Sequence, residues 1–238
     1  MEIKLLKKPK NPTIIEGFPG FGLIGTVVTE FLLDHLDVES IGTIVSKDIP
    51  AMIAIHEGKV VSPIEIFYNK KYNLVILHVV TSVVGLEWDM AQTVIDLAKQ
   101  LNAKELVSIE GVGSANAIGD SRTFYYSNVP AKRKKFEQIK INQLKEGIVM
   151  GVTGTLLLKA KTFKQPLSCI FAETRSDLPD SKAAARVVQV LDSYLGLKVD
   201  PKPLVKQAEK FEKKIKTIMQ KGKEASTLQE KKQLSYVG

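Results

Sequence analysis

The sequence predicts an α/β protein with a largely parallel or mixed sheet that is flanked by helices and followed by a C-terminal helix and a flexible tail. Short apolar runs of strand length alternate along the chain with segments whose apolar residues recur at helical spacing. The run Leu74–Val80, interrupted only by His78, is typical of a strand that is buried on both faces. Strands that alternate with helices in this way form parallel or mixed sheets.

The first half of the chain supplies most of the expected elements. A glycine-rich turn separates the first expected strand from a helix over 21–36. A second helix follows the apolar run and carries Leu86, Met90, Val94 and Leu101 along one stripe. Strands are expected at 13–15, 40–46, 51–55, 60–68, 74–80 and 106–109.

The second half continues the alternation. After a glycine-containing loop and the basic stretch Lys132–Lys135, the apolar runs Gly147–Val152 and Leu167–Phe171 are expected to be buried strands. An amphipathic helix is expected over Asp180–Leu195, and Gly196 stands where a left-handed residue ends a helix.

The last forty residues are organised differently. Asp200 and Pro201 form a helix start, with an N-cap followed by proline at the first helical position. Apolar residues then recur at alternating spacings of four and three, which is a short heptad seam that packs either on the body or on a neighbouring subunit. We therefore divide the chain into an α/β core domain (1–198), a C-terminal helix (199–221) and a flexible basic tail with an apolar tip (222–238). The seam residues, which are candidates for an oligomer interface, are Leu204, Ala208, Phe211, Ile215 and Ile218.

Composition and charge exclude several classes of protein. The single cysteine, Cys169, excludes a disulfide scaffold, and no apolar run is long enough for a membrane span. Met1–Lys10 lacks the apolar core of a secretory signal, so we expect a cytoplasmic protein without a membrane partner. Most of the net charge of +8 lies after residue 201, where ten Lys face four Glu. Only Phe211 and Tyr236 are aromatic there, so nucleic-acid binding is not expected.

One glycine pattern resembles a dinucleotide-binding loop. The segment Gly20–Gly25 matches G-x-G-x-x-G between an expected strand and helix, where glycines let the backbone approach a pyrophosphate. Glu39, however, precedes its strand, whereas the ribose-binding acid follows one. A turn with positive φ and close helix–strand packing explains the same glycines without a nucleotide, and we favour that explanation.

Carboxylates follow expected strands at Glu16, Glu110 and Glu173. If these strands are parallel, the carboxylates meet at one sheet edge, where they could hold a metal or act as acid and base. We favour the alternative in which each carboxylate accepts backbone N–H bonds or, for Glu173, pairs with Arg175. Cys169 lies in an apolar run and is expected to be an inert thiol. The three histidines lack metal-ligand spacing, so no cofactor or metal is expected.

Four segments together resemble a known family. Gly17–Gly25, Glu110–Gly113, Gly151–Leu157 and Pro179–Ala184 are similar, in this order, to motifs of the proteasome assembly chaperone family, which contains the second eukaryotic assembly chaperone and its archaeal homologues. The Lys-, Val- and Ile-rich composition is typical of archaeal proteins. The motif residues are Gly17, Gly20, Gly22, Gly25, Glu110, Gly111, Gly113, Gly151, Gly154 and Asp180.

The resemblance implies an α/β core without catalysis, a homo-oligomer, and clients among the α-subunits of the proteasome. Members of the family often end in a hydrophobic residue, a tyrosine and one further residue, and this tail inserts between α-subunits. Here Tyr236 is third from the end and Ser235 precedes it. An apolar contact would therefore come from Leu234 or Val237. The candidate partner-binding residues are Leu234, Tyr236, Val237 and Gly238.

The sequence thus favours a non-enzymatic proteasome chaperone or adaptor that forms a homo-oligomer, for which a ring is one arrangement. Its C-terminal tails are expected to dock proteasome α-subunits or, because Tyr236 is displaced, another protein client. The alternative is an enzyme of nucleotide or small-molecule metabolism that uses Gly20–Gly25 and the carboxylates at the strand ends.

Overall fold

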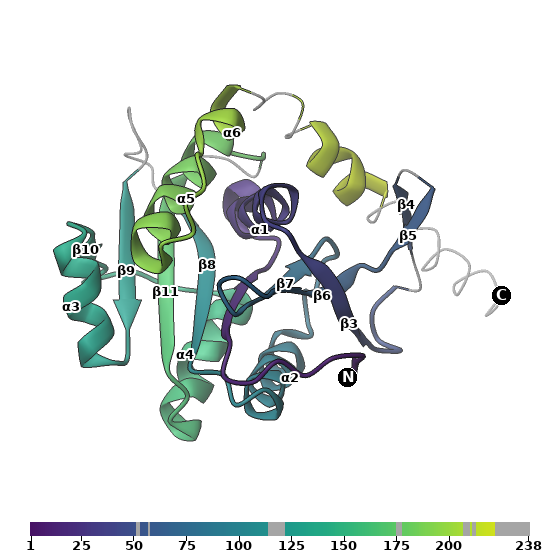
Figure 1. Cartoon of the computed structure of the whole chain (residues 1–238), viewed down its shortest axis with the longest axis horizontal. Helices are drawn as coiled ribbons and strands as arrows, with labels where there is room; N and C mark the ends of the chain where they lie inside the picture. Colours follow the sequence, from purple (N-terminus) through teal and green to yellow (C-terminus); the bar gives the residue numbers. More distant parts are fainter. Residues whose placement is uncertain are drawn as a thin grey trace, which may run out of the picture.

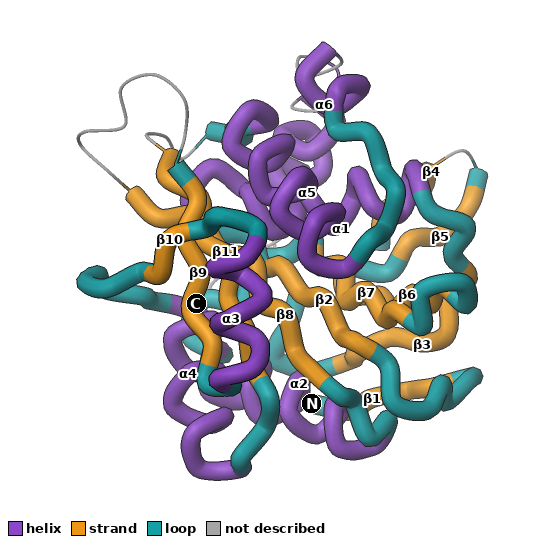
Figure 2. The backbone as a smooth tube through the Cα atoms, turned by 60° about the vertical axis from the view of Figure 1, so that its left-hand side comes forward, coloured by secondary structure: helices purple, strands orange, loops and turns teal. Residues whose placement is uncertain are grey.

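The computed structural model describes residues 1–50, 53–56, 58–113, 122–174, 178–206, 210 and 213–221. A mixed sheet forms the middle layer of the molecule, with α1 and α5 on one face and α2 and α4 on the other (Figures 1 and 2). None of the helices in these ranges is long and apolar enough to span a membrane. The predicted α/β class is confirmed.

The large sheet has nine strands in the order β1-β3-β6-β7-β2-β8-β11-β9-β10. Its centre consists of β7, β2, β8 and β11, which run parallel. The strands β1, β3 and β6 pair antiparallel with their neighbours, and β9 pairs antiparallel with β11 and parallel with β10. The four central strands therefore end at one common edge. The strands are β1 (Glu2–Leu5), β2 (Thr13–Gly17), β3 (Glu39–Val45), β6 (Ile64–Asn69), β7 (Leu74–Val79), β8 (Glu105–Gly113), β9 (Thr123–Ser127), β10 (Asn142–Gln143) and β11 (Leu167–Thr174), with β4 (Ala54–His56) and β5 (Lys59–Val61) forming a separate hairpin.

The helices cover both faces because the central strands carry apolar residues on both sides. On one face, Ile15, Val107 and Ile170 pack under α1 and α5. On the other, Ile14 and Leu106 pack under α2 and α4. The helices are η1 (Phe21–Leu23), α1 (Ile24–His35), α2 (Glu87–Gln100), α3 (Pro130–Gln138), α4 (Gly151–Phe163), α5 (Ser181–Leu195) and α6 (Lys202–Lys206), followed by a C-terminal helix over 213–221.

One predicted strand is wrong. The run Gly147–Val152 is not a strand: its first four residues form a loop, and α4 begins at Gly151. Val152, Leu156 and Ala160 are buried at helical spacing, whereas Ile148 is 88% exposed. The apolar residues of this run thus belong to an exposed loop and to a helix start, and a short run cannot distinguish these from a strand.

Other boundaries differ in smaller ways. The single strand expected at 60–68 is divided into β5 and β6 by a break at Ser62 and Pro63. The strand expected at 51–55 is represented by β4, and positions 51 and 52 lie outside the described residues. The basic stretch Lys132–Lys135 lies in α3, which the sequence did not predict. The edge strands β1 and β10 and the strand β9 were also missed, because each is short or weakly alternating.

The end of the chain packs on the body. The N–H of Lys202 donates to Asp200 Oδ1 at 3.0 Å, as expected of the predicted N-cap. Leu204 and Ile215 are both buried in the core cluster beneath α1 and α5. Figure 1 shows the C-terminal helix beside α1. The sequence predicts that the heptad seam packs either on the body or on a neighbouring subunit. Leu204 and Ile215 pack on the body.

Candidate functional site

The four motif segments converge at the edge where the parallel strands end. The first of them forms the turn from β2 into α1, and it requires glycine because strand and helix nearly touch. A Cβ atom built on Gly17 would lie 2.5 Å from the backbone of Gly25, and one built on Gly111 would lie 2.0 Å from the carbonyl oxygen of Phe21. Close packing thus explains these glycines, as the sequence favoured.

The turn is also fixed to the start of α5. Gly22 has a φ of +62°, a value that favours glycine, and its carbonyl oxygen accepts a hydrogen bond from the N–H of Asp180 at 2.9 Å. The Asp180 carboxylate caps α5 by accepting from the N–H of Ala183 at 3.0 Å, and it also accepts from the Thr174 hydroxyl at 3.0 Å. Two motifs that are far apart in the sequence therefore hold each other.

Glu110 joins the remaining motifs. Its Oε2 accepts a hydrogen bond from the Thr153 hydroxyl of α4 at 3.1 Å, and its Oε1 accepts from the N–H of Gly111 at 3.1 Å. A Cβ atom on Gly20 would lie 2.3 Å from Oε1, so only glycine leaves room for the carboxyl group at that position. Gly154 has a similar role, since a Cβ there would lie 2.5 Å from the carbonyl oxygen of Val149.

Glu16 lies deeper on the same sheet face. It is fully buried, and neither of its carboxyl oxygens forms a hydrogen bond with any residue in the described part of the chain. Burial raises the pKa of Glu16 to about 8. The nearby Ser108 hydroxyl opposes this rise, and the carboxyl group of Glu110 adds to it. Burial also raises the pKa of Glu110 to about 7, against the hydrogen bonds from Thr153 and Gly111. Both acids therefore retain protons at pH values where exposed carboxyl groups are ionised.

The third predicted carboxylate, Glu173, has a charged partner. Arg122 donates from Nε to Oε2 at 2.8 Å and from Nη2 to Oε1 at 2.7 Å, which is a bidentate pair. Arg175, the partner suggested by the sequence, lies outside the described residues. The strands that carry Glu16, Glu110 and Glu173 are parallel neighbours, so the expected gathering of the three acids at one edge is confirmed.

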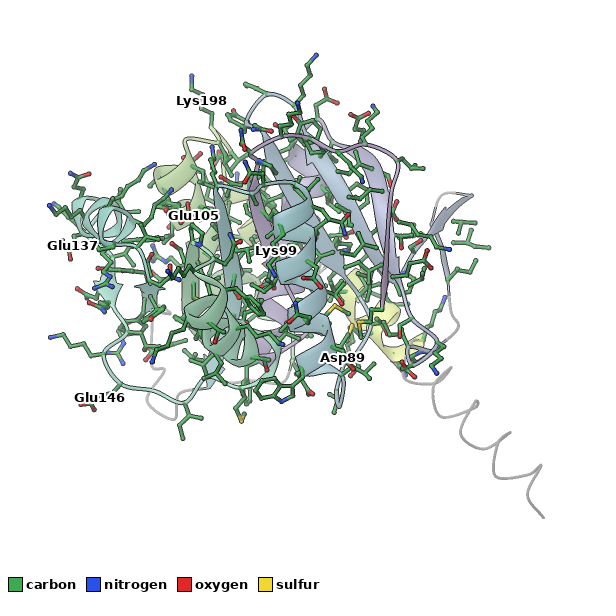
Figure 3. All side chains as sticks on the ribbon, turned by 90° about the horizontal axis from the view of Figure 1, so that it is seen from below. Asp89, Lys99, Glu105, Glu137, Glu146 and Lys198 are labelled. Atoms are coloured by element: carbon green, nitrogen blue, oxygen red, sulfur yellow. The ribbon has the colours of Figure 1, made fainter. Side chains whose placement is uncertain are left out.

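A cavity of about 1100 Å³ opens at this edge, and we call it the carboxyl-edge pocket. It lies on the face covered by α2 and α4, which Figure 3 shows from outside with Glu146 at its margin. Glu110, Glu173 and Arg122 line it together with residues that sequence reasoning missed, because their loops carry no motif. These are mainly apolar: Val83, Val84, Phe124, Leu144, Ile148, Val149 and Met150.

The geometry gives evidence on nucleotide binding and on metal binding, the two kinds of chemistry that the sequence left open. An anionic phosphate at the start of α1 would face the carboxyl group of Glu110, which lies against Gly20. Among the described residues, no three His, Cys, Asp or Glu side chains are placed to hold a metal ion. The Cys169 thiol is buried, and this burial raises its pKa well above the ordinary value, as expected for an inert thiol.

A second polar cluster anchors the C-terminal helix. Oε2 of Glu30 in α1 lies 3.0 Å from Nε2 of His78, and Glu30 also forms an ion pair with Lys214. On the other side of the imidazole ring, the Thr29 hydroxyl lies 2.9 Å from His78 Nδ1. Burial alone would raise the pKa of Glu30, but His78 and Lys214 outweigh it and lower the pKa to about 2. The helix at 213–221 is thus held by a charged contact as well as by buried Ile215.

The predicted interaction residues have different outcomes. Leu204 and Ile215 are buried in the body, and Ile218 is half-buried. Trp88 is 60% exposed at the start of α2. The remaining seam and tail candidates lie outside the described residues, so their roles stay predictions: Ala208, Phe211, Leu234, Tyr236, Val237 and Gly238.

Known proteins share this architecture. The chain is similar to the structure of Pyrococcus furiosus PbaA, described as an archaeal homologue of proteasome-assembly chaperone, with 30% identity, a TM-score of 0.85, and coverage of 94% of this chain and 100% of that one. P. furiosus PbaB, described as an archaeal proteasome activator, shares the fold with 21% identity, a TM-score of 0.75, and coverage of 91% and 98%.

The curated relatives include the uncharacterised protein MJ0106 of Methanocaldococcus jannaschii. It is 26% identical over 222 residues, which cover 91% of this chain and 90% of that protein. The model of the PAC2 family matches residues 14–219, a range that contains all four motif segments and most of the C-terminal helix. The match to the family model extends over most of the chain, and the motif segments meet at one edge of the sheet. This chain therefore belongs to the PAC2 family.

Proposed function

We propose that this protein is a non-enzymatic, homo-oligomeric proteasome assembly chaperone or adaptor that works in the cytoplasm and docks its client through its C-terminal tails. The observation that carries the proposal is the 30% identity to PbaA across nearly the whole chain. The client, by the same resemblance, is the proteasome α-subunit.

The anchoring of the C-terminal helix supports a role for the residues beyond it. Lys214 pairs with Glu30 of α1 and Ile215 is buried in the core, so the helix that precedes residues 222–238 is fixed on the body. That segment is polar at first and ends in Leu234–Gly238, which contains its only aromatic residue, Tyr236. An apolar tip after a polar tether has the composition of a docking peptide.

Several tails are needed for useful affinity. Ordering a short peptide costs about 1–2 kcal/mol of backbone entropy per residue, so one tip binds weakly. Tails on a common oligomer raise the effective concentration and can increase avidity by about 10²–10⁴. A homo-oligomer is therefore part of the proposed mechanism and not an addition to it.

Native mass spectrometry of the full-length chain, alone and with archaeal proteasome α-subunits, tests the proposal. We expect a defined multimer that adds α-subunits. Deletion of Leu234–Gly238 should abolish this binding at an unchanged multimer mass, and Ser235→Ala should retain it as a matched control. Binding of equal affinity after the deletion would exclude tail docking, and a monomer would remove the avidity argument.

An enzyme is the second candidate, because Glu110 has a raised pKa and lines a large cavity. Thermal unfolding in the presence of nucleotides and divalent metal ions separates the two candidates. A ligand at about 100 times its Kd should add about 2.7 kcal/mol of stability. A stabilising nucleotide or metal would favour the enzyme.

A further inference from the structure

The carboxyl-edge pocket has the size and the walls of a ligand site. Its volume of about 1100 Å³ is close to the upper end of the range for small-molecule pockets, about 300–1,000 Å³. It lies between the loops that precede α1, α2 and α4, at the end of a parallel sheet, where ligands of α/β proteins bind. Tail docking, the proposed function, makes no use of it.

Apolar side chains form most of the surface of the pocket, and several of them are exposed to solvent. Val84 is 85% exposed, Ile148 88% and Met150 63%, and all three line the pocket with the half-exposed ring of Phe21. Apolar area covered by a ligand contributes about 25 cal/mol per Å². The walls therefore favour a ligand with an aromatic or aliphatic body.

The charges in the pocket are unequal. The guanidinium of Arg122 is already engaged in two hydrogen bonds to Glu173, so this pair is neutral as a unit. Glu110 has only neutral donors, the Thr153 hydroxyl and the Gly111 N–H, and no Lys, Arg or His in the described ranges forms an ion pair with it. One enclosed carboxyl group thus lacks a positive partner.

A polar path continues from Glu110 into the core. Thr153 Oγ1 lies 2.9 Å from Ser108 Oγ, and behind them lies the unpartnered carboxyl group of Glu16. A buried polar group without a partner is costly, and cores rarely retain one without a role. A positive charge at Glu110 would favour its carboxylate form and lower the repulsion that Glu16 meets when it ionises.

We propose that the carboxyl-edge pocket binds a small organic cation, a primary amine or amidine on an aromatic or aliphatic body, whose charged end contacts Glu110. An anion would meet the carboxyl groups of Glu110, Glu87 and Glu146. Of the two described cations that line the pocket, Arg122 is already paired with Glu173 and only Lys145 is left to attract it. A metal ion would lack a ligand set, because among the described residues no three His, Cys, Asp or Glu side chains are placed to hold one. An organic cation has an apolar body that can pack against the apolar walls and a positive charge that can pair with Glu110.

A matched series of ligands tests the charge preference on the full chain. Isothermal titration calorimetry at pH 8 would compare 4-phenylbutylamine, 4-phenylbutanol and 4-phenylbutyrate, which share one carbon skeleton. We expect the amine to bind at least tenfold more tightly than the alcohol, and the butyrate most weakly. Glu110→Gln should remove the preference for the amine and leave the affinity for the alcohol within about twofold.

Two further variants and a pH series complete the test. Glu146→Gln, at the margin of the pocket, should keep the preference, and Val84→Ser should weaken amine and alcohol alike. In the unmodified chain the affinity for the amine should fall several-fold from pH 8 to pH 6 as Glu110 takes up a proton, whereas that for the alcohol should not change. The other groups that face Glu110 and titrate or carry charge are Glu16, Glu87, Arg122, Lys145, Cys169 and Glu173.

The pH series requires no variant, so the test remains valid if Glu110→Gln fails to fold. Equal binding of amine and alcohol, tighter binding of the butyrate, or an amine preference that survives Glu110→Gln would overturn the proposal. Failure of all three compounds to bind would overturn it as well, and would indicate that a second copy or a protein client covers the pocket. Each of these results is independent of whether the tails bind α-subunits.

Discussion

Two buried glutamates show how differently one residue type behaves at the two edges of the sheet. Glu105, at the start of β8, accepts hydrogen bonds from Lys132, Ser168 and Tyr194. Glu16, near the end of β2, has no hydrogen-bond partner among the described residues. Both are fully buried. Because a buried carboxylate is stabilised only by its partners, Glu105 contributes to the fold in its charged form and Glu16 opposes folding when it is charged.

Glu16 should make stability depend on pH. Its pKa is about 8 in the folded chain and near 4.5 in the unfolded chain, so the folded state holds a proton that the unfolded state releases. The free energy of unfolding should therefore fall as pH rises from about 4.5 to 8. In Glu16→Gln the fall between pH 5 and pH 8 should be smaller by on the order of 3 kcal/mol, since each pKa unit is worth about 1.4 kcal/mol.

Urea denaturation at the two pH values measures this difference. Part of the fall should remain in the variant, because the pKa of Glu110 is also raised. The exposed Glu146→Gln should retain the whole fall. If Glu16→Gln and the unmodified chain lose the same free energy, Glu16 does not retain its proton in the folded state.

Lys132→Met should destabilise the fold by about 3 kcal/mol, because it leaves the carboxylate of Glu105 buried without a cation. The two hydroxyl donors that remain keep the loss at the lower end of the usual range. The control is Lys7→Met, which removes the exposed ion pair with Glu39 and should cost about 0–1 kcal/mol. Similar losses in the two variants, measured by urea denaturation, would contradict this difference.

At the scale of elements, the contact between β2 and α1 determines the shape of the site. The close approach of Gly17 and Gly25 places the following turn against Glu110 and Thr174. The helix α4 contributes Thr153 from the other side. The close packing of these elements therefore determines the shape of the carboxyl-edge pocket.

Gly17→Ala should destabilise the protein by about 1–3 kcal/mol or more, because its Cβ would lie 2.5 Å from the backbone of Gly25 and the helix would have to move. Gly113→Ala, where a Cβ would have its nearest contact at 3.8 Å from Phe21, should cost much less. Chemical denaturation of both variants tests this, and equal stability of the two would show that the helix can shift at no cost.

At the scale of the whole molecule, the two sides of the sheet carry different tasks. The face under α1 and α5 holds α6 through Leu204 and the C-terminal helix through Ile215 and Lys214. The face under α2 and α4 contains the carboxyl-edge pocket. A client that binds at the tails and a ligand that binds in the pocket would therefore contact separate regions of one rigid core.

Removal of residues 222–238 should leave the body intact, because every residue of the two described core clusters lies at or before Met219. We expect the truncated chain to unfold within about 2 °C of the full chain, since a change of 1 kcal/mol shifts Tm by about 2–4 °C in a chain of this size. Calorimetry measures the Tm. A much lower Tm would indicate that the tail stabilises the core, and loss of client binding on truncation would then have two explanations.

The sequence by itself determined the fold class, the central parallel strands and the family. Apolar runs and helical stripes predict strands and helices because these residues must be buried, and the four motif segments occur in the same order as in the family. It also predicted that Glu16, Glu110 and Glu173 share one edge, because parallel strands end together. The glycines of Gly20–Gly25 were correctly attributed to close packing.

Only the tertiary structure decided which groups meet. It made α4 from a run expected to be a strand, since a few apolar residues are compatible with a strand, a helix start or an exposed rim. It paired Glu173 with Arg122, fifty-one residues away, and gave Glu16 no hydrogen-bond partner within the part of the chain that the structure describes. It also formed the pocket, in which motif residues such as Gly20 and Glu110 meet loops that carry no motif. Contacts between residues distant in the chain depend on the packing of whole elements, and no local pattern encodes them.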